Sequence, residues 1–335
     1  MRQVRILFVM TGAALAVAAC TPPARAGGDD GGGGRVDAST DNGIIDAGNG
    51  FIDATGAAID GGDTACAKID ILFVIDNSGS MSEEQANLVA NFPALAQVIE
   101  NYTTSAGTHL DYHIGVTTTD RTFVENDKIV DSPPIPFSHF GNNGKLQTGR
   151  PALPCTFPSG RNYLQRGDTN LATTFSCVAN VGTDGDSSEM PLESAKLALV
   201  DRIQDGQNAG FLRADALLAI VMLTDENDCS VSGDPVSVPQ TATLCERTDP
   251  VASYLAAFDA VKGGERGRWA AAVIAGPGPG PCSSAFGSAD EATRLKEFIT
   301  MIGPNAIFSS ICNGNLAQSL MDAFQTFGVA CENIP

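Results

Sequence analysis

The sequence predicts an α/β domain with a doubly wound, Rossmann-like and mostly parallel sheet that carries helices on both faces. Several segments after residue 66 are almost continuously apolar, as expected for strands that are buried on both faces. Segments with helical spacing of apolar residues separate them, which is the order of a repeated strand–helix unit. The chain has 335 residues, of which 43% are hydrophobic, so a sizeable core is possible.

The predicted elements alternate along residues 66–335, and no Gly/Pro-rich linker divides them, so we expect one domain. Strands are expected at "IDILFVID", "LDYHIGVTTTD", "DALLAIVMLTD", "RWAAAVIAG" and "NAIFSSI". Helices are expected at "SEEQANLVANFPALAQVIENY", "EMPLESAKLALVDRIQ", "DPVASYLAAFDAVKG", "SADEATRLKEFITMIG" and "NLAQSLMDAFQTFG". In the first helix, Ser82 and Gln85 should form a capping box, and Pro93 should kink or split the helix.

Residues 120–180 interrupt this alternation. They are irregular and rich in Pro, Gly and Asn. We expect a loop insertion here, with one hairpin near "GKLQTG".

The first residues indicate export and lipid attachment. Two arginines precede an apolar stretch, residues 6–17, which is too short to span a bilayer and is typical of a secretory signal. The stretch ends in "VAAC", which resembles the lipobox of bacterial lipoproteins. Residues 1–19 are therefore expected to be removed and Cys20 to carry the lipid. The alternative is an ordinary signal peptide that is cleaved near Ala19 or Ala26.

Residues 20–65 are expected to form a flexible tether between the lipid and the domain. Gly, Asp, Ala and Thr dominate this segment, and its scattered apolar residues cannot bury enough surface to offset the entropy of ordering. The formal charge of −19 argues against nucleic acid and anionic membrane surfaces as partners. Membrane contact is expected through the lipid on Cys20, in the bacterial cell envelope, with the outer membrane favoured over the inner one.

The cysteines indicate a disulfide framework. With Cys20 lipidated, eight of the nine cysteines remain, and an even number in an exported chain favours disulfides. The sequence contains no C-x-x-C pair, which disfavours a zinc cluster. Closeness in the sequence favours three pairs and leaves a fourth: Cys155–Cys177, Cys229–Cys245, Cys282–Cys312 and Cys66–Cys331.

Oxygen-bearing side chains follow two of the predicted strands. Asp76, Ser78 and Ser80 come directly after "IDILFVI", and Asp225 ends "VMLTD". Thr183 lies shortly before the helix that precedes the second of these strands. Ligands of open α/β sheets bind beyond the carboxyl ends of strands, and oxygen ligands suit a hard cation. We expect magnesium here, with manganese or calcium as alternatives.

The stretch "DNSGSM" matches the D-x-S-x-S pattern of the von Willebrand factor A domain, also called the integrin inserted domain. The strand–helix order of residues 68–330 also resembles that family. The resemblance implies a metal-ion-dependent adhesion site formed by three loops. Its ligands would be Asp76, Ser78 and Ser80 from the first loop, Thr183 from the second and Asp225 from the third.

The sequence departs from the family in two places. The insertion at 120–180 is long, and Asp184 and Asp186 crowd the second loop. Ser187 and Thr173 are therefore substitutes for Thr183.

The family resemblance implies a protein-binding module. A divalent ion that is held largely by hydroxyls is short of negative charge, so it should attract an Asp or Glu carboxylate of an unidentified protein partner. A structural envelope lipoprotein with a vestigial site is the alternative, and a hydrolase comes after it.

An enzyme is not expected. A phosphotransferase of the dehalogenase type would need an aspartate where Ser78 stands. The sequence has no G-x-S-x-G elbow and no phosphate-binding fingerprint in a strand–helix setting. The histidines, His109, His113 and His139, lie outside the predicted site loops.

Overall fold

The computed structural model describes residues 67–103, 107–125, 137–157, 160–238, 244–314, 316–332 and 334. The predicted signal peptide, the tether with Cys20, and Cys66 lie outside the described residues. Within the described ranges, no helix is long and apolar enough to cross a membrane.

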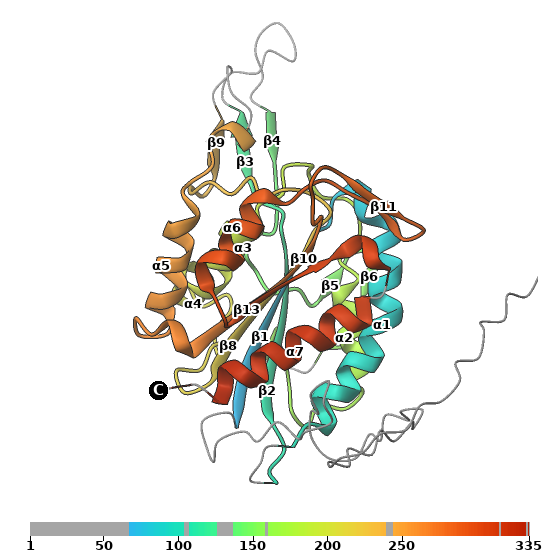
Figure 1. Ribbon diagram of the computed structural model, residues 1–335, viewed down its shortest axis with the longest axis vertical. Helices are drawn as coiled ribbons and strands as arrows, with labels where there is room; N and C mark the ends of the chain where they lie inside the picture. The colour runs from blue at the N-terminus through green and yellow to red at the C-terminus, as the bar shows by residue number, and fades with distance from the viewer. Residues whose placement is uncertain are drawn as a thin grey trace, which may run out of the picture. The chain divides into compact units, whose positions relative to one another are not determined.

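A six-stranded sheet forms the centre of the fold (Figure 1). Its strands are β1 (Lys68–Ile75), β2 (Asp111–Thr118), β7 (Leu164–Gln165), β8 (Leu217–Leu223), β10 (Trp269–Ala275) and β13 (Ala306–Ser310). They lie in the order β13–β10–β8–β1–β2–β7. All neighbours in this sheet are parallel except β7, which runs antiparallel to β2 at one edge. The predicted doubly wound, mostly parallel sheet is confirmed.

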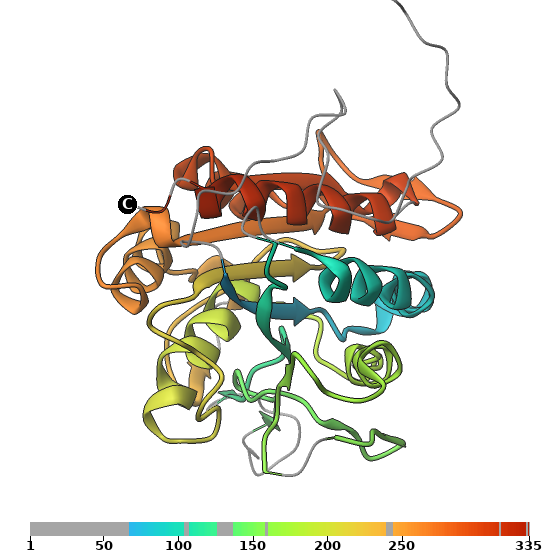
Figure 2. The ribbon, with the colours of Figure 1, turned by 90° about the horizontal axis from the view of Figure 1, so that it is seen from below.

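Helices cover both faces of this sheet (Figure 2). One face carries α1 (Ser82–Asn101), α2 (Leu171–Ala179) and α7 (Leu316–Glu332). The other carries α3 (Pro191–Leu199), which continues into α4 (Asp201–Gln204), together with α5 (Val251–Val261) and α6 (Thr293–Ile302).

The side chains of β1 alternate between the two hydrophobic cores. Phe73 and Ile75 belong to the core under α1, whereas Leu72 and Val74 belong to the core under α3 and α5. This is the period of two that a strand buried on both faces requires.

The first helix differs from expectation in two ways. Pro93 lies inside α1 without interrupting it, so the predicted split is wrong. Pro93 is exposed, so the carbonyl that loses its helical donor can bond to water. The prediction of a capping box between Ser82 and Gln85 is also wrong, because a short 3₁₀ turn, η1 (Gly79–Met81), precedes the helix. Gln85 instead donates its side-chain N–H to the backbone carbonyl of Asp76 at 2.8 Å.

The insertion is more regular than a loop. β5 (Gly149–Arg150) and β6 (Leu153–Pro154) form a hairpin close to the predicted one. The helix α2 was not predicted, because its threonines and cysteine are weak helix formers. Tertiary packing stabilises α2 instead, since the ring of Phe175 lies 5.0 Å from that of Phe73 and 4.6 Å from that of Phe92.

Besides the β5–β6 hairpin, two smaller sheets lie outside the central one in the described part of the chain. β3 (Phe123–Glu125) pairs with β4 (Phe137–His139) and with β9 (Val236–Val238). β11 (Cys282–Ser284) and β12 (Gly287–Ala289) form a hairpin. The remaining short elements are the 3₁₀ turns η2 (Leu244–Glu246), η3 (Arg266–Arg268) and η4 (Ile311–Asn313).

Three of the four predicted disulfides are present. They are Cys155–Cys177, Cys229–Cys245 and Cys282–Cys312. Cys331 is also disulfide-bonded. Its predicted partner, Cys66, lies outside the described residues, so that pairing stays a prediction.

Asp70 is the acidic residue within β1, and it is fully buried. Arg213 donates its Nε–H to Oδ1 of Asp70 at 2.8 Å and its backbone N–H to Oδ2 at 2.6 Å. Burial raises the pKa of Asp70, and the bonds from Arg213 oppose that rise. The charge inside the sheet is therefore compensated locally.

Replacing Asp70 should destabilise the domain because Arg213 would lose its buried partner. We expect Asp70→Ala to lower the free energy of unfolding by about 3 kcal/mol, measured by urea denaturation. Lys68→Ala is the control in the same strand. It removes an ion pair with Asp215 whose side chains are 42% and 63% exposed, and it should cost less than about 1 kcal/mol. Equal losses in the two variants would contradict the role assigned to Asp70.

Candidate metal centre

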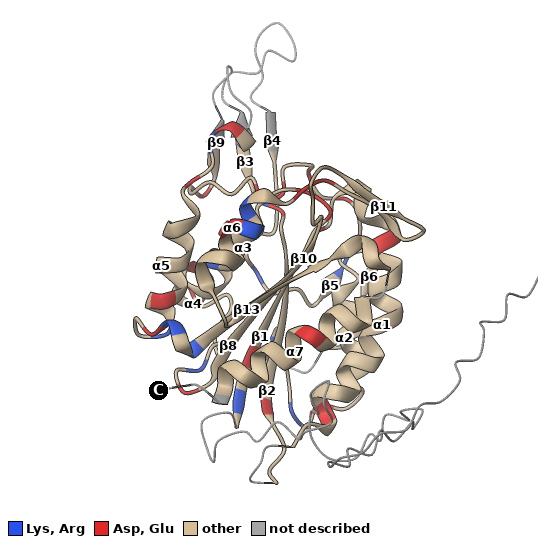
Figure 3. Ribbon diagram, viewed as in Figure 1, with Lys and Arg blue, Asp and Glu red and all other residues tan. Residues whose placement is uncertain are grey.

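The carboxyl ends of β1, β2 and β8 meet at one edge of the central sheet. The backbone N–H of Asp76 donates to the carbonyl of Leu223 at 2.9 Å, which joins the ends of β1 and β8. The N–H of Thr119 donates to the carbonyl of Ile75 at 3.3 Å, which joins β2 to the same point. Figure 3 shows acidic residues in the loops above these strand ends.

Asp76 lies at the centre of this edge and is fully buried. Its Oδ1 accepts the backbone N–H of Ser78 at 2.7 Å, and its Oδ2 accepts the hydroxyl of Thr224 at 2.6 Å. Burial raises the pKa of Asp76, against the effect of these two bonds. The first loop is thus folded around one carboxylate, and the third loop, which follows β8, supplies one of its donors.

The two serines of the first loop face each other. Their hydroxyl oxygens are 2.9 Å apart, with Ser78 buried and Ser80 exposed. Ser78 stands at the N-cap of η1, but its side chain makes no capping hydrogen bond. The pair is therefore not explained by helix capping.

Asp225 lies at the start of the third loop, near Ser80. It is 3% exposed, and the Ser80 hydroxyl is close enough to counteract part of the rise in its pKa. Burial, followed by the charge of Asp76, raises the pKa of Asp225 to about 7. Among the described residues, its Oδ1 has no hydrogen-bond partner.

No hydrogen bond in the described part of the chain places Thr183 among these residues, so its role as a ligand stays a prediction. Thr183 is half-buried, and none of the hydrogen bonds seen in the described ranges joins it to the first or third loop. The second loop reaches the first through the N–H of Gly185, which donates to the carbonyl of Asn77 at 2.8 Å. The two substitutes, Ser187 and Thr173, are exposed.

A carboxylate, Glu189, approaches the site from the second loop. Glu189 is 1% exposed and close enough to Asp76 for each carboxylate to affect the pKa of the other. The hydroxyl of Thr119 donates to its Oε2. Burial, followed by the charge of Asp76, raises the pKa of Glu189 well above its usual value. Its position as the first residue of the predicted helix "EMPLESAKLALVDRIQ" was the available signal, but the family pattern predicts a hydroxyl in this loop.

Two further carboxylates surround this group. Glu84 is 2% exposed, and its Oε2 has no partner among the described residues. Glu226 is half-buried, and burial together with the charge of Asp76 raises its pKa to about 7.

The β11–β12 hairpin covers Glu84. At Gly287, φ is +121°, and an added Cβ would lie 1.6 Å from Oε1 of Glu84, so only glycine fits. The disulfide Cys282–Cys312 ties this hairpin to η4. Ser80 and Glu226 remain the solvent-accessible members of the site.

The donor set fits a hard cation. In the described part of the chain, no group of three or more His, Cys, Asp or Glu side chains is placed to hold a metal ion. An ion at this edge would therefore need the hydroxyls of Ser78 and Ser80 together with carboxylates. Buried oxygens that lack a donor are costly, and a cation beside Asp225 and Glu189 would satisfy them.

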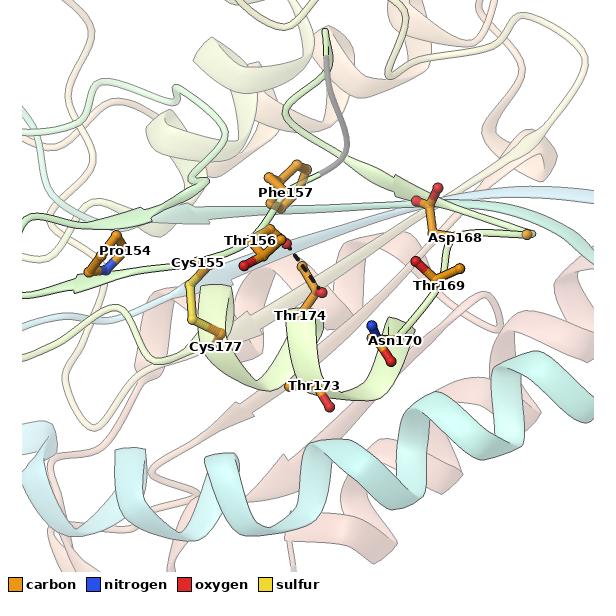
Figure 4. A pocket seen from close by; sticks show the side chains of 11 residues that line it. Pro154, Cys155, Thr156, Phe157, Asp168, Thr169, Asn170, Thr173, Thr174 and Cys177 are labelled. Atoms are coloured by element: carbon orange, nitrogen blue, oxygen red, sulfur yellow. Dashed lines mark hydrogen bonds between the residues drawn. A yellow bond between two sulfur atoms is a disulfide. The ribbon is translucent and has the colours of Figure 1, made fainter.

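A separate cleft of about 770 Å³ lies in the insertion (Figure 4). Its walls include the Cys155–Cys177 disulfide, Phe157 and the start of α2 around Asn170. Thr173 lies here, whereas none of the five predicted metal ligands does. The cleft and the group of carboxylates are therefore distinct features.

No protein-family model matches the sequence. A comparison with curated proteins finds no match either.

Solved structures show a distant similarity in fold. Proximal thread matrix protein 1 from the mussel byssus is 10% identical, with a TM-score of 0.40, over 78% of this chain and 48% of that one. Another structure of that protein, with a zinc-occupied MIDAS motif, is 12% identical, with a TM-score of 0.38, over 80% and 46%. The pilus adhesin SpaC from Lactobacillus rhamnosus GG is 10% identical, with a TM-score of 0.38, over 79% and 30%. This chain spans less than half the length of these proteins. Similarity at this level does not extend their activities to it.

Proposed function

We propose that this chain is a metal-ion-dependent binding module of the von Willebrand factor A type, which captures a carboxylate of a protein partner through a divalent cation. The observation that carries the proposal is the pair of hydroxyls from Ser78 and Ser80, set between the buried carboxylates of Asp76 and Asp225. All four lie at the carboxyl edge of a doubly wound sheet, where ligands of such folds bind.

Each residue has a distinct part in this function. Ser78 and Ser80 offer neutral oxygens, whereas Asp76 and Asp225 supply negative charge. Two hydrogen bonds hold Asp76 in place. Gln85 donates to its backbone carbonyl, and Thr224 of the third loop donates to its carboxylate. Ser80 is exposed, so a partner can approach there. When bound, the divalent cation supplies a Lewis-acidic centre for a carboxylate oxygen, and magnesium is the proposed ion, with manganese or calcium as alternatives.

The arrangement favours binding over hydrolysis. The two serine hydroxyls bond to each other, and no histidine bonds to either of them in the described part of the chain, although histidine is the usual base of a serine nucleophile. Nδ1 of His113 lies 2.7 Å from the carbonyl of Phe211, and the same ring is close to Asp70 near the opposite end of β1. Nε2 of His139 lies 2.6 Å from Oδ1 of Asp120. In these contacts, therefore, both histidines bond to groups other than the serines of the first loop.

We also propose that the protein is attached to the bacterial cell envelope. The lipobox-like "VAAC" and the Gly/Asp-rich tether support a lipid on Cys20, with the domain held away from the membrane surface. The outer membrane is favoured over the inner one.

Metal binding is tested by calorimetric titration of the full chain with magnesium, manganese and calcium. Asp76→Asn should abolish uptake at millimolar concentrations because the central charge is lost. Ser80→Ala should weaken binding by about tenfold, since a water can replace one hydroxyl. Ser82→Ala changes the same residue type at an exposed position outside the proposed ligand set, and it should bind like the wild type.

Two results would refute the metal centre. One is wild-type protein that takes up none of the three ions at millimolar concentrations. The other is an Asp76→Asn variant that binds as tightly as the wild type.

Lipid attachment is tested by detergent-phase partitioning of the protein made in a bacterial host. The wild-type chain should enter the detergent phase, and Cys20→Ser should move it to the aqueous phase, because the thiol that carries the lipid is gone. If both forms partition alike, Cys20 is not the anchor.

A further inference from the structure

Two buried acceptors face each other at the proposed metal centre. Asp76 is fully buried and Glu189 is 1% exposed, and the two carboxylates are close enough for each to affect the pKa of the other. Two ionised carboxylates repel each other at close range, so this arrangement favours a cation between them. Oε1 of Glu189 has no partner among the described residues. An unsatisfied, buried oxygen therefore points to a positively charged ligand.

Glu189 is held firmly in this position. The N–H of Cys229 donates to the backbone carbonyl of Glu189 at 2.7 Å. The next residue, Met190, donates its N–H to the carbonyl of Thr119 at 3.3 Å, and the hydroxyl of Thr119 donates to Oε2 of Glu189. The carboxylate is thus fixed between the end of β2 and the third loop. Glu189 is therefore a fixed, buried part of the site, unlike a flexible side chain on the surface.

The carboxylate of Glu189 lowers the negative charge that a bound divalent cation would still need from a partner. With a hydroxyl from the second loop, Asp76 and Asp225 would match the charge of one divalent cation. Once a cation binds, the buried Glu189 offers it a further carboxylate beside Asp76 and Asp225, in addition to the neighbouring Glu84.

We propose that Glu189 is the charge-setting residue of the centre and makes the divalent cation a resident ion, which is retained without a partner carboxylate. This inference rests on the proposed metal site. It deepens that proposal by fixing the order of events: the ion binds first and tightly, and a carboxylate of the partner binds second and more weakly.

The first test compares calorimetric manganese titrations of the full chain in three forms. Glu189→Gln keeps the shape and can still accept the bond from Thr119, but it removes the charge. We expect its affinity for manganese to fall by about tenfold or more, as removal of a nearby buried charge implies. Asp184→Asn removes one charge from an exposed position in the same loop, and its affinity should be unchanged.

A second measurement separates this role from a structural one. In the presence of a chelator, Glu189→Gln should unfold at the same temperature as the wild type or higher, because an amide can donate to Asp76 where two carboxylates face each other. Manganese should raise the unfolding temperature of the wild type more than that of the variant. If Glu189→Gln does not fold, Glu189→Thr replaces it in both measurements, with the same expectation.

Acetate, as a minimal carboxylate, tests the order of binding. Linkage is reciprocal, so a carboxylate that binds to the ion must raise the affinity for the ion by the same factor. Millimolar acetate should leave the manganese affinity of the wild type nearly unchanged and raise that of Glu189→Gln. An equal response in the two proteins would overturn the resident-ion inference.

The outcomes distinguish the inference from the proposal beneath it. Wild-type protein that takes up no divalent ion would overturn both. Wild-type protein that binds manganese, with Glu189→Gln binding equally well, would overturn the role of Glu189 alone. Weaker binding by a folded Glu189→Gln, with Asp184→Asn unaffected, supports it.

Discussion

The burial of negative charge at the ends of β1 and β8 is the constraint on which the rest of this site depends. Asp76 is taken out of water, and its carboxylate oxygens are occupied by the N–H of Ser78 and the hydroxyl of Thr224. These two bonds shape the first loop and join it to the third. They do not remove the cost of placing Glu189 and Asp225 beside the same charge, since both of those side chains keep an oxygen without a donor among the described residues. The proposed cation would resolve this arrangement, and the hydroxyls of Ser78 and Ser80 would complete its coordination.

The opposite end of the sheet shows how the same chain treats a buried charge that needs no ligand. Asp70 sits inside β1, yet it receives two hydrogen bonds from Arg213. Its charge is matched by a guanidinium, and its oxygens have donors. The carboxylates above the strand ends lack such a cationic partner in the contacts that the structure shows around Asp76, Glu189 and Asp225. Because of this contrast, we assign a structural role to the buried charge of Asp70 and a binding role to the carboxylates around Asp76.

The sequence was sufficient for the parts of the structure that depend on local pattern. Continuous apolar runs predicted the strands, and closeness in the chain predicted three disulfides. The loop after β1 could be predicted because its residues follow one another directly in the sequence. Glu189 shows the limit: its approach to Asp76 depends on how the second loop packs on Asn77 and Thr119, and that packing is long-range. Likewise, α2 forms because Phe175 enters the core beside Phe73 and Phe92, although the local propensity is weak.

The central claim, that hydroxyls and buried carboxylates at this edge hold one divalent cation, is tested most directly by crystallography of the full chain grown with manganese. Anomalous scattering locates manganese independently of the protein model. We expect a single strong anomalous peak within about 2.5 Å of the hydroxyl oxygens of Ser78 and Ser80, with Asp76, Asp225 and Glu189 around it. A well-ordered first loop without an anomalous peak, or a peak confined to exposed carboxylates such as Asp184, would contradict it.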